Sequence, residues 1–79
     1  MTKAQSRKQR TLIEVIAEAR DSAGISQRGL SSKLDRASDF IWKIENGYRE
    51  VLAIDLIEIG HALELTAAEL MARVERRLN

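Results

Sequence analysis

The chain has 79 residues, a formal net charge of +1, and neither cysteine nor proline. A single small domain of this length buries only about 60% of the surface that its unfolded chain exposes, so a partner subunit would add stability. The lack of cysteine excludes disulfides and thiolate metal sites, and no apolar run approaches the roughly 18 residues that cross a bilayer. A composition rich in Ala, Leu, Ile, Glu and Arg predicts an all-α domain that is soluble and cytoplasmic.

Charge is distributed unevenly along the chain. Residues 1–49 carry ten Lys or Arg against six Asp or Glu, whereas residues 50–79 carry three against six. This asymmetry either arises by chance in a short chain or indicates one face for nucleic acid and another turned away from it. Residues 1–10 contain four basic side chains and no acidic one, which predicts a basic N-terminal arm before a folded domain over residues 11–79. The arm is either a frayed terminus or a segment that follows DNA phosphates.

The first expected helix starts at Ser6 or Thr11 and ends at Ala23. Apolar residues recur there at steps of three and four, which is the spacing of one helix face. Gly24 follows directly, and glycine is common just past a helix C-terminus. Arg20 lies on the last turn of this helix.

Residues 26–49 predict a short helix, a turn of about three residues and a second short helix over residues 37–46 that Gly47 ends. Ser26 is a good N-cap for the first of these helices, and Asp35 and Ser38 are both candidate caps for the second. Two helices joined by so short a turn allow one to brace the other in a DNA major groove. At about 100° per residue, the second helix has an apolar face and a polar face. The apolar face holds Phe40, Ile41 and Ile44, and the opposite arc holds Ser38, Asp39, Trp42, Lys43 and Asn46.

This stretch resembles the helix-turn-helix of the Cro and phage-repressor regulators, also called the xenobiotic-response-element (XRE) family. The motif residues are Ser26, Gln27, Leu30, Leu34, Ile41, Ile44, Glu45 and Gly47. The resemblance covers residues from about 12 to 70 and implies one compact five-helix domain of the lambda-repressor-like type. Three positions depart from the family pattern: Asp35 replaces a glycine in the turn, Arg36 an apolar residue, and Trp42 a small or polar one. Aspartate tolerates the left-handed conformation at a cost, so the departures bear on base specificity more than on the fold.

Four side chains on the polar arc are the candidates for reading bases: Ser38, Asp39, Trp42 and Lys43. Lys43 can donate to guanine O6 and N7 or to a phosphate. Asp39 either accepts from cytosine N4 or stabilises the first turn of the helix through its dipole. Trp42 either packs on a thymine methyl or sugar carbons, covers Lys43, or anchors a protein contact.

The resemblance also implies a structural clamp, an ion pair between Arg20 and Glu45 that would join the first helix to the recognition helix. Breaking one partner of such a pair is costly if the pair is buried. Polar and basic residues near the start of the second helix, in the turn and after the third helix are candidates for the DNA backbone. These residues are Gln27, Arg28, Arg36, Asn46, Tyr48 and Arg49.

A fourth helix is expected over residues 52–63, with more apolar surface than one core-facing stripe requires. Thr66 and Glu69 form a capping box that predicts the start of a fifth helix. As the resemblance implies, surplus apolar residues of these two helices would form a homodimer interface. The candidates are Ile54, Ile57, Leu70, Met71, Val74 and Leu78.

The sequence lacks the groups of residues that common enzymatic sites need. His61 is the single histidine and has no cysteine or second histidine to complete a metal site or a nucleophilic pair. The four glycines are scattered, so they predict no phosphate-binding loop. We therefore expect no enzymatic activity, metal, cofactor or small-molecule ligand.

Two functions from different classes fit these features. The first is a sequence-specific transcriptional regulator, expected to be a repressor, that binds double-stranded DNA as a homodimer. Helix 37–46 of each copy would enter the major groove of a near-palindromic operator, with half-sites about 34 Å apart. The resemblance offers a phage repressor, a restriction–modification controller or an antitoxin as contexts. The alternative is a helical protein–protein interaction module, antitoxin-like or an adaptor, that keeps the fold without specific DNA binding.

Overall fold

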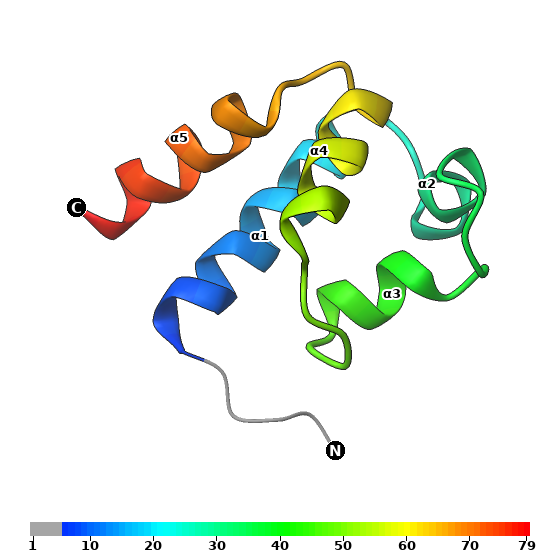
Figure 1. Cartoon of the computed structure of the whole chain (residues 1–79), viewed down its shortest axis with the longest axis horizontal. Helices are drawn as coiled ribbons and strands as arrows, with labels where there is room; N and C mark the ends of the chain where they lie inside the picture. Colours follow the sequence, from blue (N-terminus) through cyan, green and yellow to red (C-terminus); the bar gives the residue numbers. More distant parts are fainter. Residues whose placement is uncertain (1–5) are drawn as a thin grey trace.

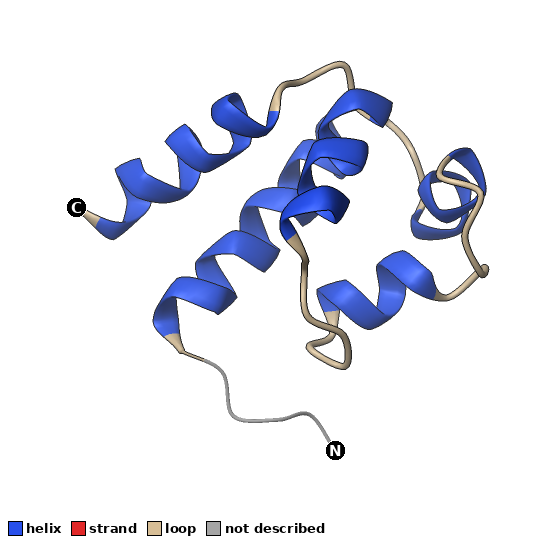
Figure 2. Ribbon diagram, in the orientation of Figure 1, coloured by secondary structure: helices blue, strands red, loops and turns tan. Residues whose placement is uncertain are grey.

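The computed structural model describes residues 6–79, and within them the chain forms five helices and no strand (Figures 1 and 2). The helices are α1 (Arg7–Ser22), α2 (Gln27–Lys33), α3 (Phe40–Glu45), α4 (Ala53–Ala62) and α5 (Ala67–Leu78). The all-α, five-helix architecture predicted from the sequence is therefore confirmed. No helix in this part of the chain is long and apolar enough to cross a membrane.

Helix α1 begins earlier than a basic arm over residues 1–10 would allow. The Ser6 hydroxyl accepts from the Gln9 backbone N–H at 3.1 Å, and the Gln9 side chain accepts from the Ser6 N–H at 3.4 Å. This capping box satisfies two N–H groups at the helix terminus and starts the helix at Arg7. The helix thus takes the earlier of its two expected starts, and residues 7–10 belong to it; residues 1–5 of the predicted arm lie outside the described residues.

The turn between α2 and α3 depends on Asp35, which adopts the left-handed conformation with φ of 58°. The Asp35 N–H donates to the Ser32 carbonyl at 2.9 Å, and the Arg36 N–H donates to the Ser31 carbonyl at 3.0 Å. These two bonds end α2 in the manner that usually employs glycine. Asp35 thus takes the conformation expected of it, and the chain reverses in the few residues that separate α2 from α3.

One hydrophobic core receives residues from all five helices. Helix α1 lies against both α3 and α5, while α4 lies against α2 and α5. Figure 1 shows α5 on one side of α1 and the α2–α3 pair on the other. The large apolar side chains without exposed surface are Ile16, Leu30, Ile41, Ile44, Ile59 and Leu70. The packing of Ile41 and Ile44 into this core therefore fixes the position of α3.

The predicted dimer interface needs a correction in α5. Leu70 and Val74 are 0% and 3% exposed because they pack into the domain's own core, and Leu78 is half-buried against the same core. The prediction that Leu70 and Val74 contact a second copy is therefore wrong. The other three candidates, Ile54, Ile57 and Met71, are exposed to 57%, 41% and 37%.

Candidate nucleic-acid interface

The candidate recognition helix is shorter than predicted. Helix α3 covers Phe40–Glu45 rather than residues 37–46. The Phe40 N–H donates to the Ala37 carbonyl at 3.0 Å, so residues 37–39 form a turn that leads into the helix. Asp39 occupies the N-cap position, but its side chain makes no capping hydrogen bond.

The two faces of this segment differ sharply in exposure. Phe40, Ile41 and Ile44 are buried in the core. The four candidate base-reading side chains, Ser38, Asp39, Trp42 and Lys43, are all exposed. We call these four residues, two in the turn before α3 and two in α3 itself, the outer face of α3. The structure leaves them uncovered by the rest of the domain, as a base-reading role requires.

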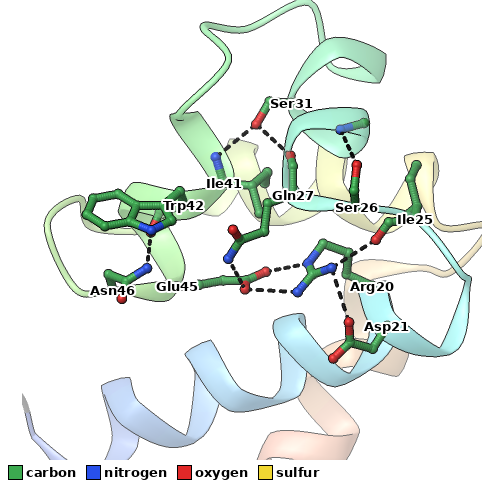
Figure 3. Close-up of polar contacts among 11 residues, drawn as sticks. Arg20, Asp21, Ile25, Ser26, Gln27, Ser31, Ile41, Trp42, Glu45 and Asn46 are labelled. Atoms are coloured by element: carbon green, nitrogen blue, oxygen red, sulfur yellow. Dashed lines mark hydrogen bonds and ion pairs between the residues drawn. The ribbon is translucent and has the colours of Figure 1, made fainter.

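Helix α2 supplies the cap that Asp39 does not. Ser31 is fully buried, and its hydroxyl accepts from the Ile41 backbone N–H at 3.0 Å (Figure 3). The same hydroxyl donates to the Gln27 carbonyl at 2.9 Å. One of the N–H groups that the start of α3 leaves without a helical partner is therefore satisfied across the helix pair. Sequence reasoning missed this role because serine inside a helix usually bonds only to its own backbone.

The predicted clamp between α1 and α3 is present. Arg20 Nε lies 2.7 Å from Glu45 Oε2, and Arg20 Nη2 lies 3.1 Å from Glu45 Oε1 (Figure 3). The two side chains are only 11% and 8% exposed. The hydrogen bond to Glu45 raises the pKa of Arg20 above its ordinary value. Arg20 also donates to the Ile25 carbonyl at 2.9 Å, so the clamp extends to the segment before α2.

Gln27 belongs to this clamp. Its side-chain nitrogen donates to Glu45 Oε1 at 2.8 Å, which joins α2 to the same carboxylate. Gln27 was a candidate for the DNA backbone, but the structure turns its amide donor towards the protein interior. The buried carboxylate needs more than one donor, and the contact of Gln27 with the DNA backbone stays a prediction.

Arg36 and Arg49 also bond within the domain. Their Nη2 atoms lie 3.1 Å and 3.0 Å from the two carboxylate oxygens of Asp55, whose side chain is fully buried. Both guanidinium groups lie over the Phe40 ring, with their Cζ atoms 4.4 Å and 4.8 Å from its centroid. Asp55 additionally accepts from the Leu52 N–H at 3.0 Å at the start of α4. This cluster fastens the turn, α3 and α4 together.

The cluster changes the interpretation of both arginines. Arg36 also pairs with Glu58 at 3.3 Å, so two cations meet two carboxylates and the formal charges cancel. The Nη2 atoms of Arg36 and Arg49 are paired within the domain, but both side chains are 34% exposed, so their contact with DNA phosphates stays a prediction. Asp55 was missed because the contact joins residues 36, 49 and 55 only in the folded chain.

One side chain of the outer face, Trp42, stacks on a second aromatic side chain, Tyr48. The Trp42 and Tyr48 rings have centroids 5.6 Å apart and an interplanar angle of 8°. They are 45% and 47% exposed. The Asn46 side chain, a candidate for the DNA backbone, donates to the Trp42 carbonyl at 2.9 Å and so closes its own helix (Figure 3).

The remaining candidates lie on the surface. Lys43 Nζ is 3.4 Å from Asp39 Oδ2, and both side chains are about half exposed, at 50% and 53%. Such a pair contributes little free energy, so Lys43 can exchange this partner for another acceptor. Arg28 is exposed and helps to line a hollow of about 470 Å³ beside α2 and the turn. Ser32 and Ser38 line the same hollow.

Among residues 6–79, no group of three or more His, Cys, Asp or Glu side chains is placed to hold a metal ion. The polar side chains of the outer face are a serine hydroxyl, a carboxylate and an ammonium group. Together they offer hydrogen-bond donors and acceptors of the kinds that read base edges.

Neither a family model nor a curated protein sequence matches the chain, but solved structures do. A single-residue variant of the restriction–modification controller protein C.Esp1396I is 23% identical, with a TM-score of 0.85 over 95% of each chain. An XRE-family like protein from Pseudomonas syringae pv. tomato is 26% identical, with a TM-score of 0.83 over 91% of this chain and 88% of that one. The clp gene regulator ClgR from Corynebacterium glutamicum is 19% identical, with a TM-score of 0.79 over 91% and 92%. The predicted resemblance is thus confirmed: the chain has the fold of the XRE helix-turn-helix regulators, the Cro and phage-repressor type.

Proposed function

We propose that the chain is a sequence-specific DNA-binding regulator of transcription, acting in the cytoplasm as a homodimer on a near-palindromic operator. The outer face of α3 carries the proposal, because it is exposed while the inner face of the same helix is buried. Two solved structures with this fold are described as a restriction–modification controller and a clp gene regulator, which supports a regulatory role.

The bracing of α3 favours groove recognition. The backbone of α3 is bonded to α2 through Ser31, and its end is bonded to α1 through Glu45. A helix fixed in this way presents its outer side chains in one orientation, so little further ordering is needed when DNA binds. Lys43 would donate to guanine, Asp39 would accept from cytosine N4, and Ser38 would bond to several bases. Arg28 and the Tyr48 hydroxyl would contact phosphates.

A homodimer is supported by exposed apolar residues on or beside α4 and α5. Leu52, Ile54 and Ile57 on or beside α4 are 53%, 57% and 41% exposed, and Met71 on α5 is 37% exposed. A domain of this size gains stability by burying such residues against a second copy. Binding to two half-sites requires the two α3 helices of such a dimer to lie in successive major grooves, about 34 Å apart.

Selection of bound sequences from a random duplex library tests the proposal most broadly. We expect enrichment of an inverted repeat whose half-sites lie about one helical turn apart. Affinity should fall steeply with salt, with a log–log slope of about −0.9 for each phosphate neutralised. A library that shows no enrichment after repeated rounds would contradict sequence-specific binding.

The proposed regulator acts as a repressor by occupying a promoter. A reporter gene placed behind the selected operator should be expressed less when the chain is present. A duplicate reporter with a scrambled operator controls for effects on growth. Higher expression from the selected operator would instead make the chain an activator.

A helical protein–protein interaction module is the second candidate. It is favoured by the pairing of Arg36 and Arg49 with carboxylates and by the acidic Asp39 on the outer face. Binding to random duplex at two salt concentrations separates the candidates. Absent or salt-insensitive binding would favour the interaction module, because DNA binding at phosphates releases counterions.

A further inference from the structure

The rings of Trp42 and Tyr48 are exposed and stack on each other, and we call these two residues the aromatic pair. Trp42 is the single tryptophan of the chain. Its ring is nearly parallel to that of Tyr48, at 8°, and about half of each residue is exposed. An exposed pair of large aromatic rings is costly to leave in water, so it indicates a binding surface.

The fold does not require the aromatic pair. The core under α3 is filled by Phe40, Ile41 and Ile44, and both rings lie outside it. Tyr48 follows the glycine that ends α3, and its N–H donates to the Lys43 carbonyl at 2.8 Å. This bond fixes the Tyr48 backbone where its ring can stack on Trp42. The indole is therefore positioned before any ligand arrives, which lowers the entropy cost of binding.

The surroundings define which ligand would suit the aromatic pair. Asp39 and Lys43 pair with each other, and the Asn46 side chain is bonded to its own helix. The aromatic pair is thus the large apolar part of a surface that is otherwise polar. Base edges in a major groove offer donors and acceptors but only one apolar group, the 5-methyl group of thymine.

We propose that the aromatic pair binds the 5-methyl group of a pyrimidine in the major groove and makes the chain sensitive to that methyl group. This inference rests on the proposed function, because it requires α3 to enter the groove. The methyl group has two sources, thymine and 5-methylcytosine, which present it at the same position of the ring. Trp42 therefore contributes specificity through apolar contact, beside the hydrogen bonds of Lys43 and Asp39.

The test uses the duplex selected from a random library and two altered versions of it. Replacing thymine by uracil within the half-sites removes the methyl group and leaves every hydrogen-bonding atom in place. We expect affinity to fall by about fourfold for each contacted methyl group, from the transfer free energy of a buried methylene. Replacing cytosine by 5-methylcytosine tests the second source: a gain in affinity assigns the site to modified cytosine, and a loss confined to the uracil duplex assigns it to thymine.

Variants of the aromatic pair show whether it causes the difference in affinity between the thymine and uracil duplexes. Trp42→Ala should bind the thymine and uracil duplexes equally, whereas Tyr48→Phe, which keeps the stacked ring, should retain the difference. His61→Ala removes an exposed side chain of α4 outside the proposed interface and should retain the difference as well. Because Trp42 lies outside the core, Trp42→Ala should still unfold in one cooperative thermal transition, which establishes that the variant is folded.

Binding can also be followed directly through Trp42 fluorescence. The emission of the single tryptophan should change more strongly on the thymine duplex than on the uracil duplex. Equal wild-type affinity for thymine, uracil and 5-methylcytosine duplexes, with the selected duplex still preferred to a scrambled one, would overturn this inference and leave the proposed function intact. Failure to prefer the selected duplex at all would overturn both.

Discussion

The Ser31 hydroxyl accepts a hydrogen bond from the Ile41 backbone N–H at 3.0 Å, and this bond joins the middle of α2 to the first turn of α3. Asp39 stands at the N-cap of α3 without a side-chain capping bond. The start of the candidate recognition helix is therefore satisfied by a different helix. The position of α3 and the packing of the helix pair depend on the same small side chain.

Ser31→Ala should destabilise the domain. The substitution leaves the buried Ile41 N–H without an acceptor, which costs about 1–3 kcal/mol. Ser32→Ala, on the exposed side of the same helix, is the matched control and should change stability by no more than about 0.5 kcal/mol. Urea unfolding of both variants measures the difference, and equal midpoints would show that the Ser31–Ile41 bond contributes no stability.

The clamp is tested by two substitutions around the same arginine. Glu45→Gln leaves the Arg20 charge without its buried partner, and we expect a loss of about 3–5 kcal/mol in the free energy of unfolding. Asp21→Asn removes the other carboxylate near Arg20, which lies 3.1 Å away but is 73% exposed. Exposed pairs contribute between about 0 and 1 kcal/mol, so this control should unfold almost as the wild type does. If both variants lost the same small free energy of unfolding, the Arg20–Glu45 pair would contribute no more stability than an exposed ion pair does.

Two carboxylates, those of Glu69 and Glu18, should contribute to the pH dependence of stability. Hydrogen bonds from Thr66 lower the pKa of Glu69 below its ordinary 4.5, and the hydrogen bond from Arg77 lowers that of Glu18. Because both pKa values are lower in the folded state, their contribution is fully present above pH 4.5 and is lost as the pH falls through the folded values. Glu69→Gln should therefore flatten the acid side of a stability curve measured by urea unfolding. A titration midpoint for the Glu69 carboxyl at or above 4.5, followed by NMR, would argue against the capping interaction.

The dimer surface is tested by a charge placed on α4. Ile57→Glu should give monomers in sedimentation equilibrium, because a carboxylate in an apolar interface is costly to desolvate. His61→Glu adds a carboxylate to an exposed position of the same helix and should leave the dimer intact. A variant Ile57→Glu that still sediments as a dimer would place the interface elsewhere.

Much of the fold could be predicted from local patterns. The glycine after α1, the capping box of α5 and the left-handed Asp35 each concern residues within a few positions of one another. The Arg20–Glu45 pair spans 25 residues, and only the family resemblance made it predictable. The Ser6–Gln9 capping box was equally readable, because it has the same spacing as the Thr66–Glu69 box.

Features that depend on packing between distant elements could not be predicted. Helix α5 has one apolar face, formed by Leu70, Met71, Val74 and Leu78, and periodicity does not say whether α1 or a second copy of the chain covers it. Leu70 and Val74 turned out to face the core, whereas Met71 is exposed. Likewise, a basic residue in a turn predicts a surface contact unless a buried carboxylate such as Asp55 lies nearby in the folded chain.

The central claim is that the outer face of α3 contacts base pairs, and amide chemical shifts measured during titration with the selected duplex test it most directly. We expect the largest changes at Ser38, Asp39, Trp42 and Lys43, including the indole N–H of Trp42, with small changes along α5. Large changes confined to α4 and α5, with the outer face of α3 unaffected, would contradict the account.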